Sequence, residues 1–472
     1  MNEKDISGLL KRYGQMLESG KSIYFDAEEF DELAEYYDML DDIDTAKKIV
    51  EDGLKIHPGN QSLLIKSAKF IVYSGEYKQA LEYLNRTFSE YDFDLYLLKI
   101  ECLLHLDSYD EANLLTQQIL DDEEMEEDII FSELGFLYAE ADYYDDAIQF
   151  FEQSLAHKPA NMEVLTDLSY SYEMCNNFSK AVEITNRILD IDPYSYESWV
   201  NLGKLYSLQD EYEKAVDAFD FALTIDDSDI DVFKLKAHCL SLCGRVEEAV
   251  TVFNECIEQN PEDESVYYSL SECYFSLEQY NEMLYCLDKY EDIHGQTAEV
   301  FAKKALAYMQ REEMELVHSS LDSGMSINPE SEDLNIVAGE FYFRLGEFSK
   351  GEFFFLKAYD KTKNNETMLD RLSLISISNN DVSKAIEYTE RLIFFNSSSM
   401  VKTRLALLYF EADDKQKFNL YLDSFDDEEL RALVKLFFSE EEFDISSITR
   451  NVLINKLNEA RECRQLFKNI AY

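Results

Sequence analysis

The sequence predicts an all-α protein built as a linear array of helical repeats, and three observations support this fold class. The five prolines fall, within one residue, in a single register, and the last four are separated by 34, 68 and 68 residues. Tyrosine recurs at the same step of 34 residues through the middle of the chain. Glycine and proline are scarce, at 14 and 5 residues, as expected of helix pairs joined by short turns. A period of 34 residues along most of a chain is typical of a helical repeat array. The register residues are Pro58, Pro159, Pro193, Pro261 and Pro329, and Tyr138, Tyr172, Tyr206, Tyr274, Tyr308 and Tyr342, with Leu240 at one step.

The first expected element is an amphipathic helix ahead of the array. Ile6, Leu9, Leu10, Tyr13 and Leu17 share one face of this helix. The end of a repeat array otherwise exposes apolar surface, so a helix of this kind is expected to cover the first repeat. We therefore assign residues 1–26 to an N-terminal capping helix.

The clearest repeat extends from Tyr196 to Asp229 and contains two amphipathic helices. Small residues, Gly203 and Ala215, stand where the two helices are expected to cross, and they allow a close approach. The apolar positions of the first helix are Trp199, Leu202, Gly203 and Tyr206, and those of the second are Ala215, Phe219 and Ala222.

This repeat resembles the tetratricopeptide repeat, in which W-x2-L-G-x2-Y is followed by Ala, Phe, Ala and Pro at fixed offsets. Only the proline departs from the pattern, because Asp227 stands in its place. The resemblance implies a right-handed superhelical solenoid of about twelve such units over residues 27–432, with Trp199 buried between the helices of its unit. The units start near residues 27, 61, 93, 128, 162, 196, 230, 264, 298, 332, 366 and 399, and the crossing alanine recurs as Ala46, Ala80, Ala112, Ala147, Ala181, Ala215, Ala249 and Ala385.

Further helices are expected after the array, and we assign residues 433–472 to C-terminal capping helices. The acids of residues 426–429 favour a helix start, and a last helix is expected over residues 446–470. From Arg450 onward five basic residues stand against two acids, in contrast to the rest of the chain. This helix either caps the last unit or occupies an acidic stretch of the array and competes with a partner, and the sequence leaves both open.

The charge of the chain limits the partners that it can bind. Lysine and arginine number 43 against 97 acids, which gives a formal net charge of −54. Such a charge repels nucleic acid and anionic membranes and favours a basic protein or peptide. The other interpretation is that most of the acids only solvate the outer face and the turns.

Three features indicate a cytoplasmic protein. The amino terminus lacks the basic and apolar regions of a signal peptide, and no apolar run approaches the ~18 residues that span a bilayer. The eight cysteines form no CxxC motif. Cys102, Cys239 and Cys273 share one position of the repeat, which predicts small buried side chains in a reducing compartment.

No catalytic motif stands out, and the sequence therefore predicts neither an enzyme nor a cofactor. GxGxxG, P-loop, HExxH and GxSxG patterns are all absent. His238, Cys239 and Cys243 are close in the sequence, but His238 and Cys239 are expected on different faces of their helix. Because a fourth ligand is also missing, we expect no metal site.

By the resemblance, the binding surface is the concave groove lined by the first helix of each unit. This groove is expected to be faced by repeat positions 2, 5, 9, 12 and 13. The groove is expected to be acidic toward the amino end, at Glu28, Asp31, Glu35 and Asp38, and mixed aromatic and basic in the middle. In the middle units the expected partner-binding residues are Phe136, Tyr170, Lys204, Lys234, His238, Tyr268 and Phe275, together with Glu272 and Met309.

These features predict a protein–protein interaction scaffold that binds a basic protein or peptide in the groove. The lysine and asparagine clamp of chaperone-binding tetratricopeptide proteins is not found across three consecutive units. The alternative is a regulatory or sensor module that binds a small peptide or a metabolite. The sequence does not indicate an oligomeric state.

Overall fold

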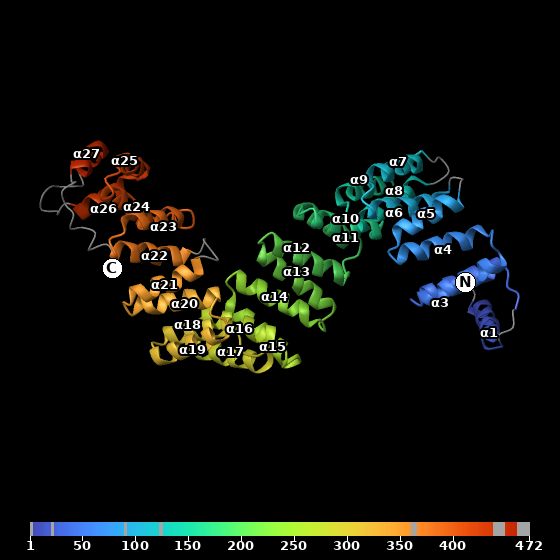
Figure 1. Ribbon diagram of the computed structural model, residues 1–472, viewed down its shortest axis with the longest axis horizontal. Coiled ribbons are helices and arrows are strands. Elements are labelled where there is room, and N and C mark those ends of the chain that lie inside the picture. The colour runs from blue at the N-terminus through green and yellow to red at the C-terminus, as the bar shows by residue number, and fades with distance from the viewer. Residues whose placement is uncertain are drawn as a thin grey trace. The chain divides into compact units, whose positions relative to one another are not determined.

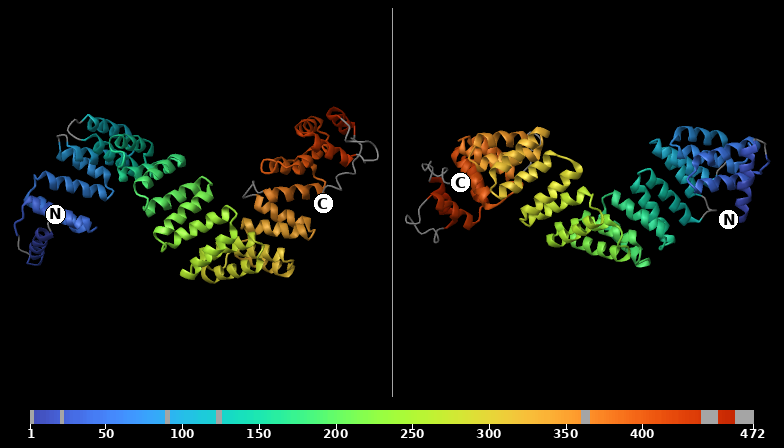
Figure 2. Two further views of the ribbon diagram at one scale, coloured as in Figure 1. Left: turned by 180° about the vertical axis from the view of Figure 1, so that it is seen from behind. Right: turned by 90° about the horizontal axis from the view of Figure 1, so that it is seen from below.

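The computed structural model describes residues 3–19, 23–88, 92–121, 126–359, 366–437 and 449–459. Within these residues it contains 27 helices and no strand. The helices follow one another as pairs that lie side by side, as Figures 1 and 2 show from three directions. The structure thus confirms the predicted all-α repeat solenoid.

The first helix of each pair, called here an A helix, begins at or within one residue of an expected repeat start. The A helices are α2 (Ala27–Met39), α4 (Gln61–Tyr73), α6 (Phe93–His105), α8 (Glu127–Glu140), α10 (Met162–Met174), α12 (Tyr196–Leu208), α14 (Ile230–Leu242), α16 (Glu264–Ser276), α18 (Ala298–Gln310), α20 (Glu332–Arg344), α22 (Glu366–Ser378) and α24 (Ser399–Glu411).

The second helix of each pair is called here a B helix. The B helices are α3 (Ile43–Ile56), α5 (Tyr77–Thr87), α7 (Tyr109–Leu120), α9 (Tyr144–His157), α11 (Phe178–Ile191), α13 (Tyr212–Ile225), α15 (Val246–Gln259), α17 (Tyr280–His294), α19 (Met314–Ile327), α21 (Phe348–Tyr359), α23 (Val382–Leu392) and α25 (Lys415–Ser424). Outside the pairs lie α1 (Glu3–Ser19), α26 (Asp427–Phe437) and α27 (Arg450–Glu459).

The chain divides into two compact units, residues 1–243 and residues 244–472. Each unit contains several consecutive A and B helices. Each repeat is stabilised by its neighbours in the array.

The turn from an A helix to its B helix repeats one backbone conformation along the chain. One residue in each of these turns has a φ between 56° and 84°, in the left-handed region. Asp, Asn and Gly occupy most of these positions because they tolerate this conformation better than other residues. The residues are Asp41, Gly75, Asp107, Asp142, Asn176, Asp210, Gly244, Glu278, Glu312, Gly346, Asn380 and Asp413, at steps close to 34.

The expected close approach of the two helices is confirmed at the crossing. A Cβ atom added at Gly203 would lie 2.5 Å from the Phe219 ring, so only glycine fits between α12 and α13 without a shift. A Cβ atom added at Gly135 would lie at the same distance from the Phe151 ring in an earlier repeat. The crossing alanines are all fully buried, as expected: Ala46, Ala80, Ala112, Ala147, Ala181, Ala215, Ala249 and Ala385.

The expected burial of Trp199 between its two helices is wrong in part. The ring does stack on Phe221 of α13, with centroids 4.6 Å apart, but Trp199 remains only partly buried. Its indole N–H donates to the Pro193 carbonyl oxygen at 2.9 Å, which keeps the ring near the start of its own helix. Phe219, not Trp199, fills the space at the crossing, because Gly203 leaves room for its ring.

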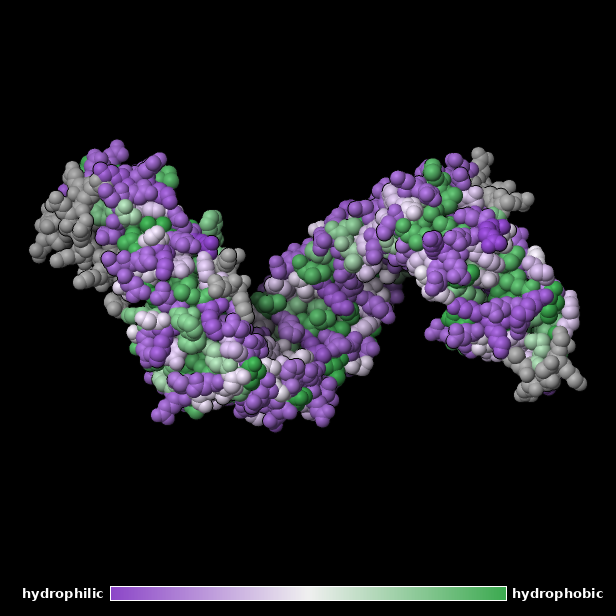
Figure 3. All heavy atoms as spheres, viewed as in Figure 1, coloured by the Kyte–Doolittle hydropathy of each residue, from purple (hydrophilic) through white to green (hydrophobic). Residues whose placement is uncertain are grey.

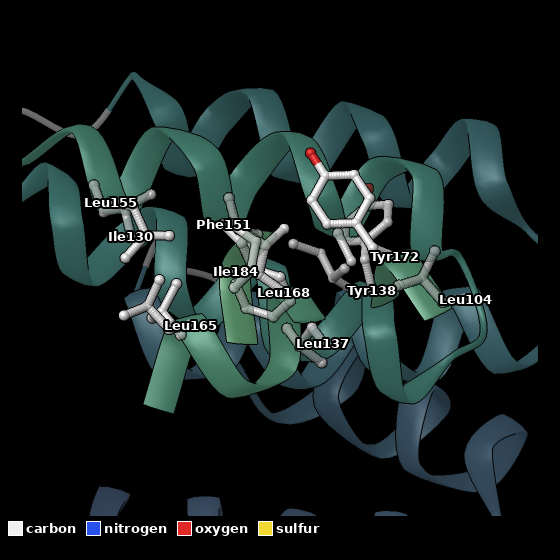
Figure 4. Close-up of a cluster of buried hydrophobic side chains, with 14 of the residues drawn as sticks. Leu104, Ile130, Leu137, Tyr138, Phe151, Leu155, Leu165, Leu168, Tyr172 and Ile184 are labelled. Atoms are coloured by element: carbon white, nitrogen blue, oxygen red, sulfur yellow. The ribbon is translucent and has the colours of Figure 1, made fainter. Parts of the chain in front are cut away.

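Core side chains of neighbouring repeats pack together in clusters that each extend over more than one repeat. Figure 4 shows part of one such cluster in residues 1–243, to which α6, α8, α9, α10 and α11 contribute apolar side chains. The three cysteines that share one repeat position are buried, as expected: Cys102, Cys239 and Cys273. Burial raises the pKa of the Cys102 thiol to about 12, which keeps it protonated and unreactive.

Three described helices, α1, α26 and α27, lie outside the pairs. Leu9 and Tyr13 of α1 are buried with residues of α2 and α3. Leu453 and Leu457 of α27 are buried in a cluster with α26. The rest of the predicted last helix, residues 460–470, and the predicted contact of Leu17 lie outside the residues and side chains that the structure describes. Across the described residues, no helix has the length and apolar character needed to cross a membrane.

Candidate functional site

The residues expected to bind a partner lie on A helices, but their surroundings differ. In residues 1–243, the Tyr170 side chain is 48% exposed and makes an edge contact with the Tyr144 ring. Lys204 and His238 are exposed on α12 and α14. Lys234 is partly buried and its ammonium lies 2.6 Å from the Asp231 carboxylate. Four of the seven expected residues are therefore on or near the surface of this unit.

Phe136 is the fifth expected residue in this unit, and it behaves more as a core residue than as a contact residue. It is partly buried, and its ring makes an edge contact with Phe151 of the neighbouring B helix, with centroids 5.2 Å apart. Phe151 packs against Gly135, the residue next to Phe136, so the ring of Phe136 lies beside a fully buried side chain.

In residues 244–472, Tyr268 and Phe275 both lie on α16. The Lys303 ammonium stands 4.8 Å above the Tyr268 ring and 2.9 Å from the Glu272 carboxylate. Phe275 is 37% exposed. Tyr268 is thus partly covered by a lysine of the next A helix.

Met309 does not face a groove, contrary to the expectation. It is only 3% exposed and belongs to the apolar cluster of α18, α19 and α20. The apolar side chain is long enough to reach the core from position 12 of its repeat, where a polar side chain would remain in solvent.

Acidic side chains gather on the A helices of residues 1–243. Asp31 and Glu35 of α2 both bind the Lys66 ammonium of α4, at 3.1 and 3.7 Å. Further along these A helices the described residues include no ion pair to the acids named next, and the charge of one carboxylate raises the pKa of another. We call this surface the acidic face, and define it by Asp38, Asp94, Glu101, Glu133, Glu140, Glu163 and Asp167.

Burial and neighbouring carboxylates raise the pKa of three carboxyl groups on the acidic face. Burial, followed by the charge of Glu140, raises the pKa of Glu101 to about 7, although Lys69 opposes the shift. Burial and then Glu163 and Glu140 raise the pKa of Asp167. The pKa of Glu133 is raised by burial and then by Asp94. These acids lie on α6, α8 and α10, so the crowding extends over three repeats.

A second feature lies on the A helices of residues 244–472. A cavity of about 830 Å³ is lined chiefly by α20, α22 and α24, and we call it the arginine hollow after Arg344, Arg371 and Arg404. Phe343, Leu374, Met400 and Val401 supply apolar lining. On the face drawn in Figure 3, hydrophobic residues form separate patches between hydrophilic ones.

The charged groups of the arginine hollow form one hydrogen-bonded chain. Glu340, only 8% exposed, accepts hydrogen bonds from Arg344 Nε at 2.9 Å and from Arg371 Nε at 2.8 Å. Asp370 accepts from Arg371 Nη1 at 3.1 Å and from Arg404 Nη1 at 2.8 Å. Burial alone raises the pKa of Glu340, but the bonds from Arg371 and Arg344 lower it overall. Glu340 is therefore held as a carboxylate.

The sequence interpretation missed a repeat position that both features share. Position 6 of the repeat carries Glu133 and Asp167 on the acidic face and Arg371 and Arg404 in the arginine hollow. It was not counted among the groove positions. The expected positions 2, 5, 9, 12 and 13, applied to the units that start at 332, 366 and 399, would have found much of the remaining lining.

Models of the tetratricopeptide repeat match the chain at residues 138–193, and at residues 196–229 and 234–263. No curated protein matches the sequence.

Solved structures show a similar arrangement of helices. One is a tetratricopeptide repeat protein from Parabacteroides merdae, at 18% identity and a TM-score of 0.47, over 52% of this chain and 98% of that one. Another is YrrB, described as a TPR protein with an unusual peptide-binding site, at 17% identity and a TM-score of 0.35, over 39% of this chain and 95% of that one. A third is the APC/C hetero-tetramer Cut9–Hcn1, at 13% identity and a TM-score of 0.37, over 97% of each chain.

The assignment of the chain to this family is based on the features of the repeat. The matched residues contain the crossing glycine and alanine, the left-handed turn and the paired helices that recur along the described chain. The chain is a tetratricopeptide repeat protein.

Proposed function

We propose that this protein is a non-catalytic scaffold of the cytoplasm that binds a basic protein or peptide along the acidic face. Tetratricopeptide repeats support a role in protein–protein interaction in general. The choice of a basic partner rests on the chemistry of the acidic face and on the net charge of −54.

The observation that carries the proposal is the crowding of carboxylates around Glu101. Its pKa of about 7 arises from burial and from Glu140, with Lys69 as the opposing charge. A lysine or arginine of a partner, placed among these acids, would relieve their repulsion and stabilise the ionised form of Glu101. The acidic face therefore gains more from a cation than from any neutral group.

Two tyrosines next to the acidic face supply contact area for the same partner. Tyr73 is 61% exposed at the end of α4, and Asp38, Glu101 and Glu140 act on its hydroxyl. Tyr170 is exposed on α10, which also carries Asp167. Exposed tyrosines of this kind frequently contribute much of the binding energy at interfaces.

The test begins with capture of partners from a lysate of the source cells, followed by binding of the identified segment at two salt concentrations. We expect a basic segment whose affinity falls several-fold as salt rises from ~50 to ~300 mM, because salt screens surface charges. The double variant Glu101→Gln, Glu140→Gln should weaken binding at low salt. Tyr170→Ala should weaken it at both concentrations.

A matched control removes two acids from a B helix of the same unit. Glu213→Gln with Asp217→Asn on α13 changes the net charge by the same amount, away from the acidic face. Binding should be nearly unchanged. A strongly acidic partner, or equal losses from the control and the Glu101 variant, would contradict the proposal.

A regulatory or sensor module remains the second candidate, and one observation favours it. The arginine hollow has the volume of a small-molecule site, and charged side chains are ordered around it. The two functions are compatible, because the hollow and the acidic face belong to different units of the chain.

A further inference from the structure

We propose that the arginine hollow binds a small organic anion. Arg344 and Arg404 would hold its carboxylate or phosphate group, and its apolar body would lie against Phe343, Leu374 and Met400. This site gives the second candidate function a class of ligand, and it is independent of the basic partner because the hollow belongs to a different unit of the chain.

The charges around the hollow leave room for an anion. The chain of hydrogen bonds contains three guanidinium groups and two carboxylates, Glu340 and Asp370. Each of these two carboxylates is already bound by two arginines. Glu366, also in the lining, accepts a hydrogen bond from Asn396 at 2.8 Å. The network by itself carries one excess positive charge, and Glu366 balances it across the whole lining. An anion would therefore be held by arginine donors that no carboxylate uses, and not by a net charge of the hollow.

Arg404 has donors that no described residue engages. It is only 6% exposed, and it bonds Asp370 and Ser373 through Nη1 alone, at 2.8 and 3.4 Å. Its Nε and Nη2 groups have no hydrogen-bond partner among the described residues, and the side chain lines the hollow. These donors are accessible from the hollow, where an anionic oxygen is a stronger acceptor than water.

Arg344 offers a second set of donors at the hollow. Its Nε group is used by Glu340, whereas its two Nη groups have no partner among the residues described. The side chain is 45% exposed, so its guanidinium can adjust to a ligand. Two guanidinium groups of this kind match the geometry of a carboxylate or a phosphate.

The lining and the volume indicate an organic ligand. Met400 is 71% exposed and lines the hollow together with Phe343 and Leu374. A methionine adapts its shape to different apolar surfaces. The volume of about 830 Å³ falls within the range of about 300–1,000 Å³ that is typical of sites for small molecules.

The test uses the full chain and three probes with a common phenylbutyl body: 4-phenylbutyrate, 4-phenylbutyl phosphate and the neutral 4-phenylbutanol. Calorimetry measures the affinity of each probe. We expect at least one anion to bind about tenfold more tightly than the alcohol, because charge-assisted hydrogen bonds are stronger than neutral ones. The anion that binds more tightly distinguishes a carboxylate ligand from a phosphate ligand.

Variants assign the binding to the hollow. Arg344→Gln should weaken anion binding about tenfold and leave the alcohol unaffected. Arg404→Lys keeps the charge, removes the guanidinium donors and should act in the same direction. If Arg404→Lys does not fold, Arg344→Gln decides, since its side chain is partly exposed.

Arg311→Gln is the matched control in the same unit. Arg311 pairs with Glu313 at 2.7 Å and is not part of the lining, so its loss should not change anion binding. The proposal is overturned if the alcohol binds as tightly as both anions, or if Arg344→Gln binds the anions like the unmodified protein. Neither result bears on the basic partner, whose site lies in residues 1–243.

Discussion

At the scale of single residues, the glycine at the helix crossing determines how closely an A helix approaches its B helix. Gly203 and Gly135 each face a phenylalanine ring from the partner helix. A phenylalanine that is fully buried, such as Phe219, has little freedom to move aside.

Gly203→Ala should therefore lower the free energy of unfolding by ~1–3 kcal/mol, because the added methyl group would lie 2.5 Å from the Phe219 ring. The control is Gly14→Ala in α1, where no atom lies within 4 Å of an added Cβ. That change should be neutral or stabilising by up to ~1 kcal/mol, from the better helix propensity of alanine. Urea unfolding followed by circular dichroism compares the two, and equal midpoints would contradict the crossing model.

Glu101 makes the stability of the acidic face depend on pH. Its pKa is higher in the folded protein, at about 7, than its ordinary value of 4.5. The folded state then binds more protons than the unfolded state between these values, so stability falls as pH rises from about 4.5 to about 7.

Glu101→Gln should remove this part of the pH dependence. Relative to the unmodified protein, the variant should gain ~1–2 kcal/mol between pH 5 and pH 8, which allows for solvent around the partly exposed carboxyl. Urea midpoints at the two pH values measure the gain, with Glu213→Gln as the control. A variant whose midpoints change with pH as much as those of the control would show that Glu101 titrates normally.

At the scale of the elements, the left-handed turn determines where an A helix ends and its B helix begins. Glycine, aspartate and asparagine hold this position in most repeats, but Glu278 and Glu312 hold it in two. A glutamate in the left-handed region is strained, because its Cβ approaches the following carbonyl oxygen. These two turns are therefore sites where the protein can be stabilised.

Glu312→Gly should raise the stability of residues 244–472 by ~1 kcal/mol, because Glu312 has a φ of 60° and glycine adopts this conformation without strain. Glu312→Ala is the control, since alanine keeps the Cβ and should change stability little. Thermal unfolding measures both variants. If both stabilise equally, the side-chain charge and not the backbone is responsible.

At the scale of the whole molecule, the chain carries most of its charge as acid but ends in a basic segment. The described part of that segment is bound locally. Arg450 donates to the carbonyl oxygens of Phe425, Leu422 and Asp423, at 2.8, 3.1 and 3.0 Å. These bonds cover the carbonyl end of α25. They favour the cap over the competitor for α27.

Deletion of residues 446–472 should therefore lower the thermal stability of the protein, because it exposes the apolar surface that Leu453 and Leu457 cover. The affinity for the basic partner should not change. Arg450→Met isolates the capping bonds and should cost ~1–3 kcal/mol. A truncated protein that stays soluble and binds its partner more tightly would instead identify the segment as a competitor.

The sequence by itself determined the repeat, its register and the family. Pro193 and Tyr206 mark the period, and Gly203 and Ala215 mark the crossing, because each position has one steric role that recurs wherever two helices cross in the same way. The burial of Cys102, Cys239 and Cys273 followed from the same register.

Only the tertiary structure decided how neighbouring repeats combine. The partial exposure of Trp199 depends on how Phe219 fills the crossing, and Met309 is buried by residues of the next pair. The arginine hollow needs Glu340, Asp370 and Arg404, one from each of three A helices. Such contacts join residues about 30 positions apart, and the pattern within one repeat contains no information on which side chains of the next repeat will meet them.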